Sequence, residues 1–508
     1  MRKHQIPLAV LFLSMYGFQK AVCADILIHG FHRSQSHAHN LAYLGAALIK
    51  HGHSVDVLTF TTGIINDVYT EIGLPILELM ATSYINADVL SDFYGTSNDH
   101  VSSKLLNTDA AFCDALFQHK EYIRDTLKSY DMAVTTSRCR CCIMLLQYVG
   151  IPHVLLHVAT DAGYATDIPA PLSYYPIERT TLMLTDKMTF LNRLQNTLAS
   201  ILVIPVKNNN IAFTKLYHKH NVIPERHLLS NLHILVKDFA IDYVHPLGPN
   251  VIPIGLLTAR PANNLSTDLE EFMHSSGNEG VIVVSIGTVI KHLPKKTLDI
   301  ILSTLARFPQ KTVFSYRGST PPGLGDNVKI VKWFNQNDIL GHPKTRLFLT
   351  HGGASSYREA MYHGVPIVCI PLLFDQFDTA AKIKYKGVGT YVKMKSLNNE
   401  NLYEAMVDVL SNEKYSYRAK QLSAIVKDVP MNATETAVFW IEHVIKHGVN
   451  HLNVYGKNLS VIEYYLVDVI TVIVVTISFT ANMRSDFALL LLLVIDISGE
   501  EQHLSENV

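Results

Sequence analysis

The chain has little of what defines several large classes of protein. Only 6 of its 508 residues are cysteine, which excludes a small fold that depends on a dense disulfide framework. Its 43 basic and 44 acidic side chains give a formal net charge of −1. Without a basic excess, nothing in the charge indicates a nucleic-acid partner.

The few cysteines also do not suggest a metal centre. Three of them cluster at Cys139, Cys141 and Cys142. This cluster lacks the paired C-x-x-C knuckles and the histidine spacing of a zinc site, so the sequence predicts no metal. The cysteines are expected to face the interior of a helix or to form a disulfide.

What the chain does have is length and apolar content. Its 508 residues predict two or more domains, and a hydrophobic fraction of 48% is ample for their cores. Alternating patterns predict strands at 25–29, 54–60, 130–136 and 153–159, with helices at 38–50 and 139–149. Alternation of this kind is typical of an α/β, doubly wound parallel sheet, whose ligands lie beyond the carboxyl ends of the strands.

A polar stretch, 253–268, reads as a linker to a second domain of the same class. Strands are predicted there at 281–286, 312–316 and 328–333, and helices at 399–410, 415–426 and 434–446.

Both ends of the chain suggest the secretory pathway. Residues 1–24 have a basic start, an apolar middle and small residues before a cut after Ala24, as in a signal peptide. Sequons at Asn264, Asn432 and Asn458 suit such a lumen. Near the other end, 466–481 and 488–497 are apolar, interrupted by Arg484 and Asp486. A single membrane span, a hairpin and a soluble tail all remain open.

Residues 333–376 carry the densest group of candidate site residues. A predicted strand at 346–350 runs into His351-Gly352-Gly353, and a helix is predicted from Ser355 to His363. The free N–H groups and positive dipole of a helix start suit a phosphate. The plainer alternative is a capping box formed by Ser356 and Glu359, which needs no ligand.

The order of motifs around this turn resembles the UDP-glycosyltransferase family, glycosyltransferase family 1. Trp333-x-x-Gln336 is followed by His351-Gly352-Gly353, by Glu359, and by Asp375-Gln376 after an apolar strand. The resemblance covers about residues 25–465. It implies a GT-B fold of two Rossmann-like domains facing a cleft, with a C-terminal membrane segment.

The family pattern assigns roles to individual residues. It implies that Trp333 stacks on uracil and Gln336 contacts the base or ribose. Glu359 would bind the ribose hydroxyls, and Asp375 and Gln376 the sugar hydroxyls. The residues expected to face or underlie the diphosphate are Gly287, Thr288, His351, Gly353, Ser355 and Ser356.

The same resemblance singles out His37 as the general base. Sugar transfer to a hydroxyl needs a group that accepts its proton, and histidine is suited to that near neutral pH. The family usually orients this histidine with a carboxylate, but the matching position here is Thr136. Asp161 is the alternative carboxylate. The departure leaves the efficiency of catalysis in question.

The expected activity is inverting transfer of a hexose, glucose or glucuronic acid, from a UDP-sugar to a small lipophilic acceptor. The UDP-sugar is a co-substrate and no cofactor is expected. Residues 169–200, with Tyr174, Tyr175 and Phe190, would line the acceptor pocket or simply pack the core. The rival expectation is a weak or inactive UDP-sugar-binding partner of related transferases.

The expected setting is the endoplasmic reticulum membrane, with luminal catalytic domains in a single-pass type I arrangement. A homo- or hetero-oligomer is left open. The predicted parts are signal peptide 1–24, acceptor domain 25–255, linker 256–275, UDP-sugar domain 276–464, transmembrane region 465–497 and tail 498–508.

Overall fold

The chain divides into two compact units, Met1–Asn453 and Val454–Val508, which we describe separately. The computed structural model describes residues 23–29, 35–59, 76–78, 98–158, 175–177, 182–203, 211–223, 232–287, 293–319, 324–453, 459–464 and 466–480. The predicted signal peptide lies almost entirely outside these residues.

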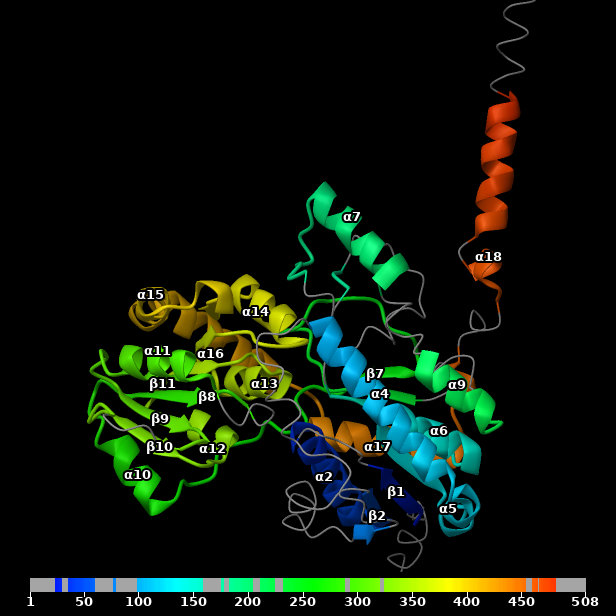
Figure 1. Cartoon of the computed structure of the whole chain (residues 1–508), viewed down its shortest axis with the longest axis horizontal. Coiled ribbons are helices and arrows are strands. Elements are labelled where there is room, and N and C mark those ends of the chain that lie inside the picture. The colour runs from blue at the N-terminus through cyan, green and yellow to red at the C-terminus, as the bar shows by residue number, and fades with distance from the viewer. Residues whose placement is uncertain are drawn as a thin grey trace, which may run out of the picture. The chain divides into compact units, whose positions relative to one another are not determined.

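Seven parallel strands form the first sheet, in the order β3-β2-β1-β4-β5-β6-β7. Figure 1 labels β1, β2 and β7 of this sheet. They are β1 (Asp25–His29), β2 (Ser54–Thr59), β3 (Ile76–Glu78), β4 (Met132–Thr136), β5 (His153–His157), β6 (Leu232–Leu235) and β7 (Val251–Pro253). Chain order reverses between β1 and β4, which is where open α/β sheets bind ligands. The predicted parallel sheet is confirmed.

Helices cover both faces of this sheet because its strands are apolar on both sides. Ile26 and Ile28 of β1 pack in one core with α2 (Gln35–Lys50) and α17 (Ala433–His447). Leu27 points to the other core, as the alternation of a strand requires. The helices of that second core are α4 (Asn98–Phe117), α5 (Lys120–Leu127), α6 (Arg140–Val149) and α9 (Ile211–Lys219).

The second sheet repeats this plan with six parallel strands in the order β10-β9-β8-β11-β12-β13. They are β8 (Val281–Ser285), β9 (Lys311–Ser315), β10 (Val328–Val331), β11 (Thr345–Thr350), β12 (Ile367–Cys369) and β13 (Gly389–Tyr391). Val281 and Val283 face one core while Ile282 and Val284 face the other. Two Rossmann-like domains are therefore present, as predicted.

The helices of the second domain divide between its two cores. One core takes α10 (Thr267–His274), α12 (Gln336–Leu340), α13 (Ala354–His363), α14 (Gln376–Tyr385) and α16 (Glu413–Lys427). The other takes α11 (Lys295–Leu305) and α15 (Asn399–Ser411), with η5 (Met394–Ser396) beside it. The structure thus places α10, whose Leu269 and Met273 are buried, inside the stretch expected to be a linker.

Helix α17 leaves the second domain and packs against the first. Its Val438 and Ile441 lie in the core beside β1, and its Glu435 pairs with His51 at 2.9 Å. A second pair joins Glu442 to His53 at 3.2 Å. The expected return of this helix to brace the first domain is confirmed.

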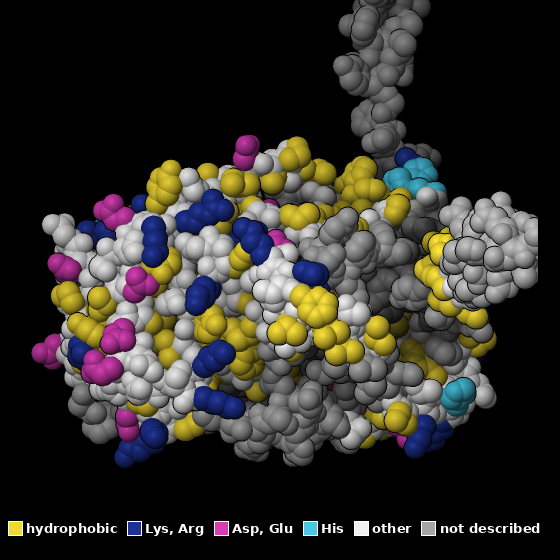
Figure 2. Space-filling model, turned by 90° about the horizontal axis from the view of Figure 1, so that it is seen from above, with side chains coloured by type: hydrophobic (Ala, Val, Ile, Leu, Met, Phe, Trp, Pro, Cys, Tyr) yellow, Lys and Arg dark blue, Asp and Glu magenta, His cyan; other side chains and the backbone are white. Residues whose placement is uncertain are grey.

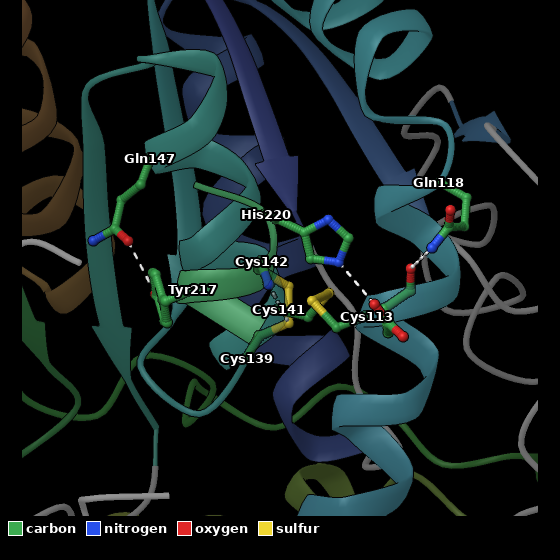
Figure 3. Close-up of a disulfide and its surroundings, with 9 residues drawn as sticks. Cys113, Gln118, Cys139, Cys141, Cys142, Gln147, Tyr217 and His220 are labelled. Atoms are coloured by element: carbon green, nitrogen blue, oxygen red, sulfur yellow. Dashed lines mark hydrogen bonds and ion pairs between the residues drawn. A yellow bond between two sulfur atoms is a disulfide. The ribbon is translucent and has the colours of Figure 1, made fainter. Parts of the chain in front are cut away.

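Four of the cysteines form two disulfides at the start of α6 (Figure 3). Cys113 on α4 bonds to Cys141, and Cys139 bonds to Cys142. All four side chains are buried. Of the two outcomes expected from the sequence, the structure therefore shows the disulfide, and Cys369 stays a buried thiol in the second domain.

The remaining described elements lie outside the two sheets and their main cores. Helix α7 (Phe190–Leu198) runs into the π-helix η3 (Ala199–Val203), and η6 (Asn450–Leu452) follows α17. The C-terminal unit holds α18 (Val461–Tyr464) and an exposed apolar helix at 467–480. Within the ranges given above, no helix has both the length and the apolar character needed to cross a bilayer. Residues 481–497 of the predicted membrane region lie beyond those ranges.

On the face shown in Figure 2, Lys and Arg side chains are spread among hydrophobic ones, and most of the visible Asp and Glu side chains lie toward one end.

Candidate functional site

Helix α13 begins at the carboxyl edge of the second sheet without a side-chain cap. Its N-cap residue is Gly353, which has no side chain and so makes no side-chain cap hydrogen bond. The capping box that the sequence allowed between Ser356 and Glu359 is therefore not formed. The first N–H groups of α13 keep the polarity that suits an anion.

Two glycines around this helix start make room for the ring of His351. A Cβ added at Gly287 would come within 2.5 Å of His351 Nε2, and one at Gly353 within 2.7 Å. Gly287 also has φ of +80°, which other residues rarely adopt. Both glycines are thus needed to fit an imidazole against the turn. Thr288 lies outside the described residues.

The imidazole of His351 is neutral at physiological pH. Burial lowers its pKa to about 4, against the opposing negative charge of Asp375 and a hydrogen bond with the main chain of Ser285. His351 can therefore offer a diphosphate a hydrogen-bonding dipole but no positive charge. Its expected place beside the diphosphate stays a prediction.

Three predicted nucleotide-binding side chains meet in one cluster. Gln336, the first residue of α12, donates from Nε2 to Glu359 Oε2 at 2.7 Å and to Ser356 Oγ at 3.1 Å. Burial raises the pKa of Glu359 to about 7, while the bond from Gln336 and the charge of Arg260 act in the other direction. This carboxyl sits one turn along the helix from Ser356, so acceptors for hydroxyls lie beside donors for phosphate.

The indole of Trp333 lies at the end of the second sheet, just before α12. Trp333 is 50% exposed. The guanidinium of Arg317 lies over its ring, 5.3 Å from the ring centre. Sequence reasoning missed Arg317, because nothing local connects it with a tryptophan sixteen residues later.

The two predicted sugar-binding residues lie at the start of α14, where Asp375 is the N-cap and Gln376 the first helical residue. Gln376 Oε1 accepts hydrogen bonds from the N–H groups of Leu372 and Leu373, at 2.8 and 2.9 Å. This oxygen therefore braces the loop. Phe374 adopts φ of +54°, an uncommon value for a residue with a side chain. The strained turn places Asp375 at the start of α14, near enough to His351 to affect its pKa.

The predicted catalytic residues lie at the carboxyl edge of the first sheet. His37 is buried in the first turn of α2, which follows β1. Thr136 is the buried last residue of β4, the neighbour of β1. The topology thus brings both to the point where chain order reverses. Asp161 lies outside the described residues.

The expected acceptor-lining aromatics do not form one group. Tyr175 is buried, and its ring centre lies 5.4 Å from that of His245. Phe190 begins α7 and is 68% exposed. Tyr174 falls outside the described residues. The two described aromatics therefore lie in different environments.

Side chains that sequence reasoning did not select join the nucleotide helices to the first domain. Arg358 on α13 donates from Nη1 to the carbonyl of Val158, which follows β5. On α14, Lys382 forms a buried ion pair with Asp242 at 2.6 Å. The positive charges around Asp242, Lys382 first among them, outweigh its burial and lower its pKa. Both helices that carry site residues are thereby anchored across the two domains.

The linker is tied to the same region. Arg260 forms a bidentate pair with Asp338 of α12, at 2.8 and 3.2 Å, and its Nε lies 3.3 Å from the hydroxyl of Tyr43 on α2. Because α2 carries His37 and α12 carries Gln336, this network connects the two halves of the candidate site.

Comparison with known proteins gives matches along nearly the whole chain. A family model described as "UDP-glucoronosyl and UDP-glucosyl transferase" matches residues 17–493. The 2-hydroxyacylsphingosine 1-beta-galactosyltransferase of Homo sapiens is 30% identical, over 92% of this chain and 88% of that protein. UDP-glucuronosyltransferase 2C1 of Oryctolagus cuniculus is 32% identical, over 88% of this chain and 95% of that protein.

Solved structures agree on the fold. The glycotransferase of kitacinnamycin superposes with a TM-score of 0.57 at 17% identity, covering 83% of this chain and 98% of that one. The glycosyltransferase VinC, solved in complex with DTDP, gives a TM-score of 0.56 at 16% identity, covering 84% of this chain and 100% of that one.

Proposed function

The chain belongs to the UDP-glucuronosyl and UDP-glucosyl transferase family, and we propose that it transfers a hexose from a UDP-sugar to a small lipophilic acceptor. The observation that carries the proposal is the contact of Gln336 with Ser356 and Glu359 beside the uncapped start of α13. This group offers hydroxyl acceptors and phosphate donors within one helical turn of each other.

The donor would lie across the carboxyl edge of the second sheet. The exposed face of Trp333 takes the base, Glu359 accepts from the ribose hydroxyls, and the N–H groups that open α13 hold the diphosphate. Ser355 and Ser356 add hydroxyl donors there. Asp375 and the amide nitrogen of Gln376 face the hexose. Because His351 is neutral, the helix dipole and these donors carry most of the stabilisation of the leaving UDP.

The acceptor would be activated by His37 at the edge of the first sheet. As the acceptor oxygen attacks the anomeric carbon from the face opposite UDP, His37 takes its proton, and the bond to the diphosphate oxygen breaks. This sequence inverts the anomeric centre. Thr136 can offer the imidazolium a hydrogen bond but no opposite charge.

The donor sugar follows from the relatives only as a class. Their names include glucuronosyltransferases and a galactosyltransferase, so a test panel needs UDP-glucose, UDP-glucuronic acid and UDP-galactose.

The test is UDP release by the purified full chain with that donor panel and a set of phenols and lipophilic alcohols. His37→Ala should lower kcat by about 10²–10⁴-fold while leaving UDP affinity unchanged. His39→Ala, two residues along the same helix, is the matched control and should keep its activity. Unchanged turnover in His37→Ala would remove the base from the proposal.

A second candidate function is a UDP-sugar-binding partner with little turnover, and Thr136 is the residue that favours it. UDP binding without transfer across the whole panel would decide for this alternative. Thr136→Asp gives a sharper test, since a restored carboxylate should raise turnover if the site still works as a transferase site.

We also propose an endoplasmic reticulum location, with the signal peptide at 1–24 and membrane attachment through 465–497. Exposed Asn264 offers a sequon to the lumen, while Asn432 caps α17 through its side-chain oxygen. Sensitivity to endoglycosidase H, lost in Asn264→Gln, would support the luminal placement. Release of the full chain by alkaline carbonate would contradict the membrane attachment.

A further inference from the structure

Three histidines gather where α17 ends, away from the nucleotide and acceptor residues. His443 and His447 lie one turn apart on α17, and their ring centres are 4.9 Å apart. His451 comes from η6, which follows the helix, and its Nε2 lies 2.9 Å from Nε2 of His443. His447 and His451 are exposed and His443 is partly so.

We propose that His443, His447 and His451 form a binding site for one divalent transition-metal ion of the zinc class. Imidazole nitrogens are the ligands that zinc, copper and nickel prefer, whereas calcium and magnesium require oxygen. Glu442 of the same helix pairs with His51 and His53, so the proposed ligands are the three imidazoles. The ligand set is therefore neutral and nitrogen-based.

The spacing of His443 and His451 is close to what a metal needs. Zinc binds histidine nitrogen at about 2.0–2.1 Å, so two nitrogens on one tetrahedral ion lie about 3.3 Å apart. The Nε2 atoms of His443 and His451 share a hydrogen bond at 2.9 Å. When the ion binds, the two nitrogens must separate slightly and release the shared proton to solvent. His447, as an exposed residue at i+4, can turn its side chain toward the same point. Water would complete the coordination.

Lys446 stands next to His447 on α17. Its positive charge opposes a bound cation, so the affinity should be moderate.

A competing cluster of Glu270, His274 and His342 is better explained without a metal. Its ligand atoms all lie within 4.8 Å of one another. However, Nδ1 of His342 accepts a hydrogen bond from the N–H of Lys344 at 3.1 Å. The proton of that ring must then sit on Nε2, which donates to Glu270 at 3.2 Å. A metal on this Nε2 would displace the proton and break the arrangement.

Binding at the end of α17 would fix the last turn of the first unit. Leu452, beside His451, and Trp440 both pack against the core of the first sheet. A metal bound to both His443 and His451 would cross-link the end of α17 to η6 and stabilise the folded state. Zinc should therefore raise the melting temperature of this domain.

The test is calorimetric titration of ZnCl2 into the full chain, purified without a histidine tag. We expect one bound equivalent, with affinity lowered at least about tenfold in His443→Ala and in His451→Ala. His451→Asp should recover part of the binding, because a carboxylate also ligates zinc. His274→Ala is the matched control from the competing cluster and should bind zinc like the unaltered chain.

A second readout uses Trp440, whose ring centre lies 5.3 Å from that of His443. In a Trp333→Phe background it is the one tryptophan left of the 2 in the chain, and bound Cu²⁺ should quench its fluorescence. The same quenching with His443→Ala/His451→Ala would overturn the proposal. So would zinc affinity lost in His274→Ala instead, or no zinc bound at about 100 µM.

Discussion

The two disulfides at the start of α6 can be removed one at a time and the two variants compared. Most contributions to their free energies of unfolding that are hard to calculate are shared and cancel in the difference. One double variant, Cys113→Ala/Cys141→Ala, removes the bridge from α4 to α6. The other, Cys139→Ala/Cys142→Ala, removes the bridge within the turn. Both remove two buried sulfurs, so the cost of the space left behind is similar.

The bridges differ mainly in the loop that each closes. The sequence separation is 28 residues for Cys113–Cys141 and 3 for Cys139–Cys142. Loop-closure entropy then gives about 3.6 kcal/mol for the long loop and about 1.6 kcal/mol for the short one. Cys139 also caps α6, since its sulfur accepts from the N–H of Cys142 at 3.3 Å. Loss of the cap costs up to about 1 kcal/mol, so the long-loop variant should be less stable by about 1–2 kcal/mol.

The assay is urea unfolding followed by the fluorescence of Trp440 in a Trp333→Phe background. Trp440 packs against the core that β1, α2 and α17 form in the first domain. Its emission therefore reports unfolding of the domain that holds both disulfides. The free energy of unfolding of each double variant is compared with that of the same background.

Equal destabilisation by the two variants, or the larger loss from Cys139→Ala/Cys142→Ala, would refute the loop argument. Peptide mapping under non-reducing conditions is the independent check. A bond from Cys113 to Cys139 or Cys142 would show that the pairing itself is wrong.

The other predictions concern the site and its supports. Burial raises the pKa of Glu359 from 4.5 to about 7. Protonation of Glu359 therefore stabilises the unliganded fold at low pH. This contribution to the free energy of unfolding, no more than about 3 kcal/mol, is lost as pH rises through about 7. Glu359→Gln should flatten the pH dependence of the urea midpoint and remove a rise in UDP affinity, measured by calorimetry, between about pH 6 and 8. Trp333→Ala should weaken UDP binding by about 1–3 kcal/mol, whereas Trp333→Phe should keep most of the binding energy. Equal UDP affinity in the unaltered chain and in both variants would exclude stacking. Lys382→Met leaves Asp242 buried without its partner and should cost about 3–5 kcal/mol in urea unfolding, whereas Asp242→Leu/Lys382→Met should recover most of that loss.

The strands and helices with strong periodicity were predictable from local sequence. The apolar runs of β1, β4, β8 and β11 identify buried parallel strands, and their neighbours follow from the alternation with helices. Short elements were not predicted. The three-residue β3 carries too little pattern, and α10 was hidden in a polar stretch although Leu269 and Met273 have helical spacing.

In the candidate site, the sequence supplied residue types and order, and the fold supplied contacts. Gln336 and Glu359 are 23 residues apart and meet only because α12 and α13 pack against each other in the same core of the second domain. Without that contact, a capping box was an equally good reading of Ser356 and Glu359. The charge state of His351 also depends on burial that no local motif encodes.

What the sequence determined by itself is the class of fold and the identity of the motif residues, because periodicity and motif order are properties of neighbouring residues. Only the tertiary structure decided which cysteines pair, how Asp242 finds Lys382 across 140 residues, and where α17 returns. Those outcomes depend on which surfaces meet when two sheets and their helices pack, and packing joins residues whose separation along the chain carries no local signal.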